Sequence, residues 1–215
     1  MNRLAAVLWD LDGTILDTEP LWMAAERELA DQHGVEWTEA DGLALVGNDL
    51  KDSGRWIRER LSSPMSAEEI VDHLVARLAA AVRRDRPWRP GARELVEELA
   101  ARGVPQALVT MSYASIAEPV ADLLPFDTVV TGDVVTRGKP DPEPYLLAAE
   151  RLEVRAEDCI AIEDSPPGAA SAQAAGCFVV AVPHMVDVPP AERRILLPGL
   201  GGLDAAALLE LWGRA

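Results

Sequence analysis

The stretch AAVLWDLDGT, which runs from Ala5 to Thr14, decides the fold. Its first five residues are continuously apolar, a pattern typical of a strand buried on both faces of a sheet. Further apolar runs of strand length occur at residues 104–109, 126–130, 159–162 and 177–182. Helical patterns lie between these runs, at residues 92–102, 144–152 and 168–175. This alternation predicts an α/β fold built on a doubly wound, Rossmann-like parallel sheet with right-handed crossovers.

The alternation is interrupted once, after the first apolar run. The gap between residues 9 and 104 is far longer than a simple strand-to-strand crossover needs. Helical patterns fill it at residues 19–33, 38–46 and 49–61, and a capping box at Ser66 and Glu69 opens a further helix that runs to about residue 84. We therefore expect an all-helical domain of residues 17–87, inserted into a core of residues 1–16 and 88–215.

Composition narrows the classes of partner. The chain has 215 residues, 20 basic and 36 acidic, for a formal net charge of −16. So acidic a protein repels nucleic-acid phosphates and anionic lipids, so neither nucleic acid nor a membrane is an expected partner. Cys159 and Cys177 lie inside apolar runs, which is typical of reduced core residues in a cytoplasmic protein. We also expect a monomer.

Lysine is rare in this chain. Of the 20 basic residues only Lys51 and Lys139 are lysines, so arginine serves nearly everywhere else. Because an ammonium group is a compact point charge and a guanidinium group a broad planar fork, a lysine kept in such a chain is a candidate for a task that arginine cannot perform.

Polar residues follow three of the predicted strands. Asp10 follows the first, Thr110 follows the second, and Glu163 and Asp164 follow the run at residues 159–162. Open parallel sheets bind ligands beyond the carboxyl ends of their strands, at the point where the strand order reverses. If the first strand is central, these side chains converge on one site.

The first of these positions carries two carboxylates. Asp10 and Asp12 are two residues apart at a strand end, and Gly13 permits a sharp turn directly after them. One carboxylate at such a place can bind a metal or attack an electrophile while the other moves protons.

These segments resemble the motifs of a known family. The stretch DLDGTILD at residues 10–17 resembles the first motif of the haloacid dehalogenase superfamily, most of whose members are phosphotransferases with an aspartate nucleophile. Its other motifs occur in the expected order, in LVTMS at 108–112, GKPDP at 138–142 and IEDSPPG at 162–168. The resemblance covers nearly the whole chain and is specific to the subgroup of β-phosphoglucomutases and sugar-phosphate phosphatases with a helical cap.

The resemblance implies a two-step phosphoryl transfer. Asp10 would attack phosphorus and form an aspartyl phosphate, and Asp12 would give a proton to the leaving oxygen and later take one from water. Thr110 would hydrogen-bond the phosphoryl group, together with backbone amides near Leu11, Asp12 and Met111. Lys139 would neutralise phosphoryl and carboxylate charge.

A magnesium ion is implied as the cofactor. Asp10, the backbone carbonyl of Asp12, and Asp164 would hold Mg²⁺, a hard cation that prefers oxygen ligands. Glu163 would be a direct or an outer ligand, and the sequence leaves both roles open.

The inserted domain would be a cap that closes over the phosphate and selects the substrate. We take Glu19, Trp22, Gly47 and Lys51 as its candidate substrate residues. The stretch DTEPLW at residues 17–22 resembles sugar-phosphate phosphatases of the subgroup. The mutase relatives carry a histidine where Trp22 stands and an arginine shortly after the cap glycine, where Gly47 is followed by Asn-Asp-Leu.

The predicted function is hydrolysis of a small phosphorylated metabolite, a sugar or polyol phosphate, with Mg²⁺. Asp12 argues against a haloacid dehalogenase, which lacks the second acid, and also against a phosphonoacetaldehyde hydrolase, although the cap residue Lys51 keeps that reading open. A β-phosphoglucomutase-type sugar phosphomutase is the alternative, and a catalytically silent partner-binding protein is the second alternative.

Overall fold

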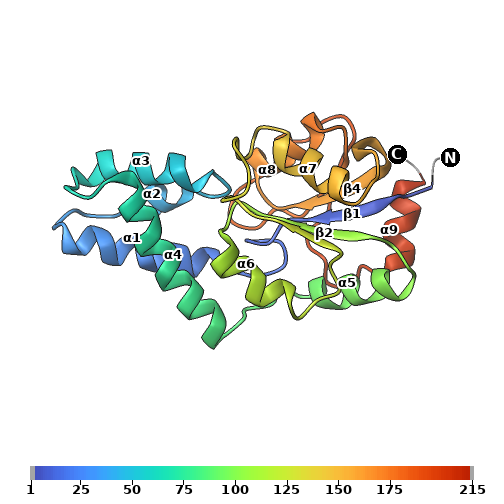
Figure 1. The fold of residues 1–215 in the computed structure, drawn as a ribbon, viewed down its shortest axis with the longest axis horizontal. Coiled ribbons are helices and arrows are strands. Elements are labelled where there is room, and N and C mark those ends of the chain that lie inside the picture. Colours follow the sequence, from blue (N-terminus) through green and yellow to red (C-terminus); the bar gives the residue numbers. More distant parts are fainter. Residues whose placement is uncertain (1–2, 214–215) are drawn as a thin grey trace.

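The structure is a computed structural model that describes residues 3–213. In the described chain, six parallel strands form one sheet in the order β3-β2-β1-β4-β5-β6 (Figure 1). The strands are β1 (Ala6–Trp9), β2 (Gln106–Val109), β3 (Thr128–Val130), β4 (Cys159–Glu163), β5 (Phe178–Ala181) and β6 (Arg194–Leu196). The order reverses beside β1, so the predicted doubly wound, Rossmann-like α/β fold is confirmed.

Strand β1 is central and buried on both faces, as its continuous apolar run predicts. All four of its residues are buried, and Trp9 lies in register with Leu108 of β2 and Ile162 of β4. Val7 and Trp9 belong to one apolar cluster, whereas Ala6 and Leu8 belong to the other. Successive side chains therefore point to opposite faces, and the carboxyl ends of β1, β2 and β4 meet at one edge.

Helices cover both faces of the sheet (Figure 1). On the face of Val7 and Trp9 lie α5 (Ala92–Ala101), α6 (Ala114–Ala121) and α9 (Ala205–Trp212). On the other face lie α7 (Glu143–Arg151) and α8 (Pro166–Ala174), and a short 3₁₀ helix, η1 (Ala156–Asp158), precedes β4. β6, α6 and α9 were not predicted from the sequence.

The predicted inserted domain is all helical. It contains α1 (Glu19–Gln32), α2 (Glu39–Leu43), α3 (Leu50–Leu61) and α4 (Ala67–Arg84), which lie together at one end of the molecule (Figure 1). Its own core includes Trp37, whose ring meets that of Trp56 edge-on with centroids 5.7 Å apart. Its two connections to the core run side by side, because Leu16 forms an antiparallel bridge with Trp88 and the amide of Asp17 donates to Pro87 O at 2.7 Å.

The structure also describes the two cysteines and the character of the helices. Cys159 and Cys177 are both buried and free. None of the helices within residues 3–213 combines the length and the apolar character that crossing a membrane requires.

Helix α4 begins at the predicted capping box, and this cap gives a stability prediction. Ser66 Oγ accepts a hydrogen bond from the amide of Glu69 at 3.2 Å, and the Glu69 carboxylate accepts one from the amide of Ser66 at 2.7 Å. We expect Ser66→Ala to lower the free energy of unfolding by about 1 kcal/mol, because the first turn loses an acceptor. Urea titration followed by circular dichroism measures this, with Ser66→Thr, which keeps the cap, as the control. Equal stability of the alanine and threonine variants would contradict the role of the cap.

Candidate active site

The side chains at the ends of β1, β2 and β4 come together as the sequence predicts. Asp10 follows β1, Thr110 follows β2, Glu163 ends β4 and Asp164 follows it; all four are buried. β1 lies between β2 and β4 and pairs with both in parallel register, so the three strand ends lie beside one another. The sheet therefore positions these four side chains.

Lys139 brings the positive charge into this group. Its Nζ lies 2.6 Å from Asp10 Oδ1 and 2.6 Å from Glu163 Oε1, and it donates to Val109 O at 3.1 Å. Burial by itself lowers the pKa of Lys139, but the Asp10 and Glu163 carboxylates outweigh burial and hold the pKa above its ordinary value. One of the two lysines of the chain thus stays charged in the buried centre of the site.

Both carboxylate oxygens of Glu163 have partners, unlike those of Asp10 and Asp164. Besides the ion pair with Lys139, its Oε1 accepts a hydrogen bond from Tyr145 Oη at 2.5 Å, and its Oε2 accepts one from Ser165 Oγ at 3.4 Å. A Cβ at Gly168 would lie 2.0 Å from Glu163 Oε2, so only glycine leaves room for this carboxylate. The contacts favour a positioning role for Glu163.

The acidic residues form a group that could hold a metal ion. Asp10, Glu163 and Asp164 each offer one oxygen, and the three atoms lie within 4.8 Å of one another. Oδ2 of Asp10 and Oδ2 of Asp164 are buried without a hydrogen-bond partner. A Cβ at Gly13, where φ is +81°, would lie 2.0 Å from Asp164 Oδ2, so the turn after β1 needs glycine to admit that carboxylate.

The electrostatics of this group also fit a cation. Burial raises the pKa of Asp10 to about 8, opposed by Lys139 and reinforced by Glu163 and Asp12. Burial likewise raises the pKa of Asp164, with Asp10 and Glu163 adding to it. Crowded, buried carboxylates with two unpartnered oxygens are a donor set for a hard divalent cation, whose charge would offset both burial and repulsion. The side chain of Asp12 is not in this group, so a backbone contact remains its candidate route to the metal.

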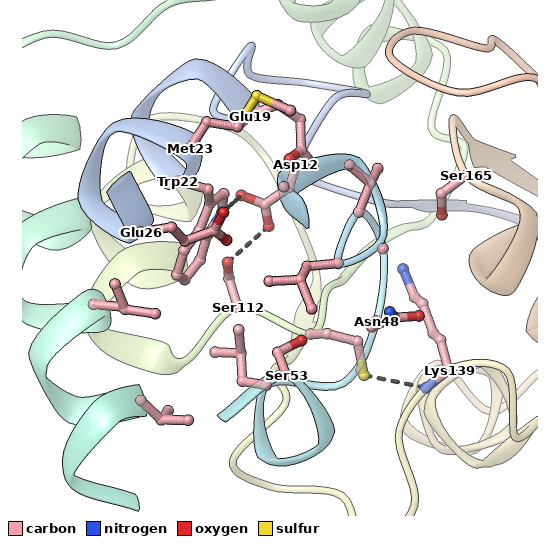
Figure 2. Close-up of a pocket in the computed structure, with 18 of the residues that line it drawn as sticks. Asp12, Glu19, Trp22, Met23, Glu26, Asn48, Ser53, Ser112, Lys139 and Ser165 are labelled. Carbon is pink, nitrogen blue, oxygen red and sulfur yellow. Dashed lines mark hydrogen bonds between the residues drawn. The ribbon is translucent and has the colours of Figure 1, made fainter. Parts of the chain in front are cut away.

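Asp12 instead accepts four hydrogen bonds. Its Oδ1 accepts from Thr18 Oγ1 at 2.6 Å and from Trp22 Nε1 at 3.3 Å. Its Oδ2 accepts from Thr110 Oγ1 at 3.1 Å and from Ser112 Oγ at 2.7 Å, the last of which Figure 2 shows. Two of these donors come from the start of the inserted domain and two from the core. Asp12 therefore joins the two parts of the molecule at the site.

A cavity lies between the core site and the inserted domain (Figure 2). Three of the candidate cap residues, Glu19, Trp22 and Gly47, line it. Lys51 is exposed on α3 and is not among the lining residues. A Cβ at Gly47, where φ is +75°, would lie 2.5 Å from Ser165 Oγ, so the cap touches the core directly at this glycine.

The remaining predicted phosphate-binding residues lie nearby. Met111 lines the cavity, and its Sδ accepts a hydrogen bond from the amide of Lys139 at 3.3 Å (Figure 2). Leu11 is fully buried and does not line the cavity.

Burial raises the pKa of Glu19 to about 8, with Asp12 and Glu26 adding to the effect.

Sequence reasoning did not identify Ser112, Tyr145 or Thr18 as site residues. Ser112 had a usable signal, since it lies two residues beyond Thr110 on the same strand end. Thr18 precedes α1 as its N-cap residue, yet its side chain does not cap the helix and donates to Asp12 instead. Tyr145 lies on the buried face of α7, where its pattern is that of an ordinary core residue.

Comparisons with known proteins show what this chain is similar to. Hexitol phosphatase A of Escherichia coli (strain K12) is 34% identical over 193 residues, covering 87% of this chain and 87% of that protein. The chain spans 49% of the length of the bifunctional riboflavin kinase/FMN phosphatase of Arabidopsis thaliana, with 32% identity over 186 residues and 84% of this chain covered. A crystal structure of β-phosphoglucomutase from Clostridium difficile has the same fold, with a TM-score of 0.83, 21% identity and 98% of each chain covered.

The family itself follows from a longer match. The model of the family described as haloacid dehalogenase-like hydrolase matches residues 4–176, which include all four motifs and the whole helical insertion. Together with the sheet order and the convergence of Asp10, Lys139 and Asp164, this match shows that the chain belongs to the haloacid dehalogenase-like hydrolase family.

Proposed function

We propose that the chain is a Mg²⁺-dependent phosphatase that hydrolyses a small sugar or polyol phosphate through an aspartyl phosphate on Asp10. The observation that carries this proposal is the state of the Asp10 carboxylate. Its Oδ1 is paired with Lys139, while its Oδ2 is buried and unpartnered, and Asp164, whose Oδ2 is also unpartnered, belongs to the same group of carboxylates. The hexitol phosphatase activity named for the relative supports a polyol phosphate as substrate.

In the first step a carboxylate oxygen of Asp10 attacks phosphorus, and the bond between phosphorus and the alcohol oxygen breaks. Asp12 donates the proton that the departing oxygen needs. In the second step water attacks the phosphoryl group and the bond to Asp10 breaks. Asp12 accepts the proton of that water, and inorganic phosphate leaves.

Asp12 must change partners to perform these transfers, because it only accepts hydrogen bonds in the structure. Two of its donors, Thr18 and Trp22, belong to the inserted helical segment, so an opening of that segment would release Asp12 from both. Lys139 stays fixed and charged beside Asp10, where it offsets the negative charge of an arriving phosphate.

Asp10 and Asp164 would hold the cation, with Glu163 as their buried neighbour. When bound, the cation would neutralise the phosphoryl oxygens and lower the repulsion between the substrate and the Asp10 carboxylate. This chemistry fits the two unpartnered oxygens described above.

Phosphate release in the presence and absence of metal tests the proposed function. We expect the purified chain to release inorganic phosphate from sorbitol 6-phosphate or p-nitrophenyl phosphate with Mg²⁺. EDTA should reduce the rate to background, and added Mg²⁺ should restore it. The site offers carboxylate oxygens that suit Mg²⁺, and the divalent cation would neutralise the phosphoryl oxygens of the substrate. Full activity in the chelator would overturn the metal assignment.

The same assay separates hydrolysis from phosphoryl transfer between sugars. A mutase must keep its aspartyl phosphate from water until a second sugar hydroxyl arrives. Trp22 and Leu50 line the cavity. The family resemblance implies that they stand where the mutases carry a histidine and an arginine, and neither side chain can make a charge-assisted contact to a second phosphate. β-Glucose 1-phosphate with a trace of bisphosphate primer should therefore yield free phosphate, and glucose 6-phosphate formed faster than free phosphate would favour the mutase.

A further inference from the structure

The cap side of the cavity has an unusual charge. Its polar lining residues are Glu19, Glu26, Asn48 and Ser53, and its apolar ones include Trp22, Met23, Leu45, Ile57, Val71 and Leu74. None of the cap residues that line it is a lysine, arginine or histidine. Lys139 is the single basic residue around the cavity within the described chain, and it is already paired with Asp10 and Glu163. A second phosphate or a carboxylate on the substrate would find no positive charge there to pair with.

Glu26 lies in this wall and is not part of the reaction described above. It follows Glu19, Trp22 and Met23 at helical spacing, so one face of α1 presents all four residues to the cavity. Glu26 is only 5% exposed. Figure 2 shows its carboxyl group beside Trp22, turned toward the cavity.

The Glu26 carboxyl is buried, and one of its oxygens lacks a well-formed hydrogen bond. Its Oε2 is buried and has no partner, and a buried acceptor without a donor is costly. Burial raises the pKa of Glu26 to about 7, opposed by a hydrogen bond from the Trp37 indole. This hydrogen bond is weak, because neither Trp37 Nε1 nor Glu26 Oε2 has a partner at full hydrogen-bond geometry although both atoms are buried.

Space next to this oxygen is kept open by a glycine. A Cβ at Gly42 of α2 would lie 3.5 Å from Glu26 Oε2 and 3.2 Å from Met23 Cγ. Any larger residue at this position would therefore fill the region beside the unpartnered oxygen. Gly42 lies inside a helix, where glycine is less favourable than alanine. It lines the cavity, so the space beside it is part of the cavity.

We propose that Glu26 is a specificity-determining residue, whose Oε2 accepts a hydrogen bond from a hydroxyl or ammonium group on the organic part of the substrate. This inference rests on the proposed phosphatase function and adds the class of ester: a monophosphate with a hydrogen-bond donor remote from the phosphorus and no second anionic group. The phosphate would occupy the Lys139 end of the cavity, and the donor would meet Glu26 at the cap end.

The test compares kcat/KM for several esters in the full chain with Mg²⁺. The probes are p-nitrophenyl phosphate, which has no donor, sorbitol 6-phosphate, glucosamine 6-phosphate and fructose 1,6-bisphosphate. We expect Glu26→Leu to lower the ratio of kcat/KM for sorbitol or glucosamine 6-phosphate to that for p-nitrophenyl phosphate by about 10- to 100-fold. Fructose 1,6-bisphosphate should be the poorest sugar substrate of the wild type.

Further variants separate substrate recognition from structural support. Glu28→Leu, on the exposed side of the same helix, is the matched control and should leave the ratio unchanged. Gly42→Ala favours the helix yet fills the space beside Oε2, so it should lower the ratio in a chain that remains folded. Glu26→Gln keeps an acceptor but loses the charge; a larger loss for glucosamine 6-phosphate than for sorbitol 6-phosphate would identify the donor as ammonium, and equal losses would identify a hydroxyl.

Several results would overturn the inference. An unchanged ratio in Glu26→Leu would do so, as would an equally large drop in Trp37→Phe, since Glu26 would then act by holding Trp37. Failure of the proposed function gives a different result, namely no phosphate release from any ester by the wild type. In that case quenching of tryptophan fluorescence by sorbitol 6-phosphate in Asp10→Asn, with and without Glu26→Leu, still measures the contact: weaker binding in the double variant supports it and equal binding refutes it.

Discussion

Asp10→Asn is expected to abolish phosphate release while leaving the fold intact. The amide has the shape of the carboxylate but is not a nucleophile, so the rate should fall by a factor on the order of 10⁴ or more. The fold should survive because the change removes one of three crowded carboxylates and Lys139 keeps Glu163 as its partner. Steady-state assays with p-nitrophenyl phosphate and thermal unfolding curves measure the two effects.

The control for this substitution is Asp31→Asn, the same chemical change at an exposed position on α1. Acid quenching of the wild type during turnover of a ³²P-labelled ester should trap the label on Asp10, as an acyl phosphate that hydroxylamine cleaves. Label recovered on another residue, or turnover by the Asp10→Asn variant within tenfold of the wild type, would rule out the covalent mechanism.

Lys139→Met is expected to damage both stability and activity. The change leaves Asp10 and Glu163 without the ammonium group that lies 2.6 Å from each. Removing one partner of a buried ion pair costs about 3 to 5 kcal/mol, because uncompensated charge remains in the interior. Turnover should fall as well, since the arriving phosphate then meets unneutralised carboxylates.

Urea unfolding and steady-state kinetics measure these two losses. Lys51→Met is the matched control for stability, because it removes the other lysine of the chain from an exposed position and should change the free energy of unfolding by less than about 0.5 kcal/mol. Both variants being equally stable would mean that the ion pairs of Lys139 add nothing to the fold, and normal turnover of Lys139→Met would remove Lys139 from the mechanism.

The sequence predicted the parts of the fold that depend on continuous apolar runs. β1 could be predicted because all four of its residues are buried, which the run before Asp10 indicates directly. β6 could not, because its three residues are Arg194, Ile195 and Leu196, too few and too exposed to form a pattern. α6 contains Pro119 and spans only eight residues, so its helical signal is weak as well.

The candidate site divides in the same way. Residues at strand ends, such as Asp10 and Asp164, follow from the topology once the parallel sheet is predicted. Tyr145 and Ser112 act through partners more than 15 residues away in the chain, and such pairings depend on tertiary packing. Glu26 did carry a signal, because it is an acidic residue in phase with Trp22 and Leu29 on the buried face of α1. Its charge alone would assign it to solvent, and only its phase in the helix indicates burial.

The pairing of Leu16 with Trp88 has a consequence for how this protein can diversify. Two strands joined by such a bridge approach one another closely enough for a tight two-residue turn to connect them. The two ends of the helical segment between these residues therefore leave the sheet at neighbouring points. Changes in that segment would leave the strand ends that carry Asp10 and Asp164 in place, so the proposed selection of substrate can evolve while these residues stay fixed. Asp12 is the exception, because Thr18 and Trp22 of that segment donate hydrogen bonds to it.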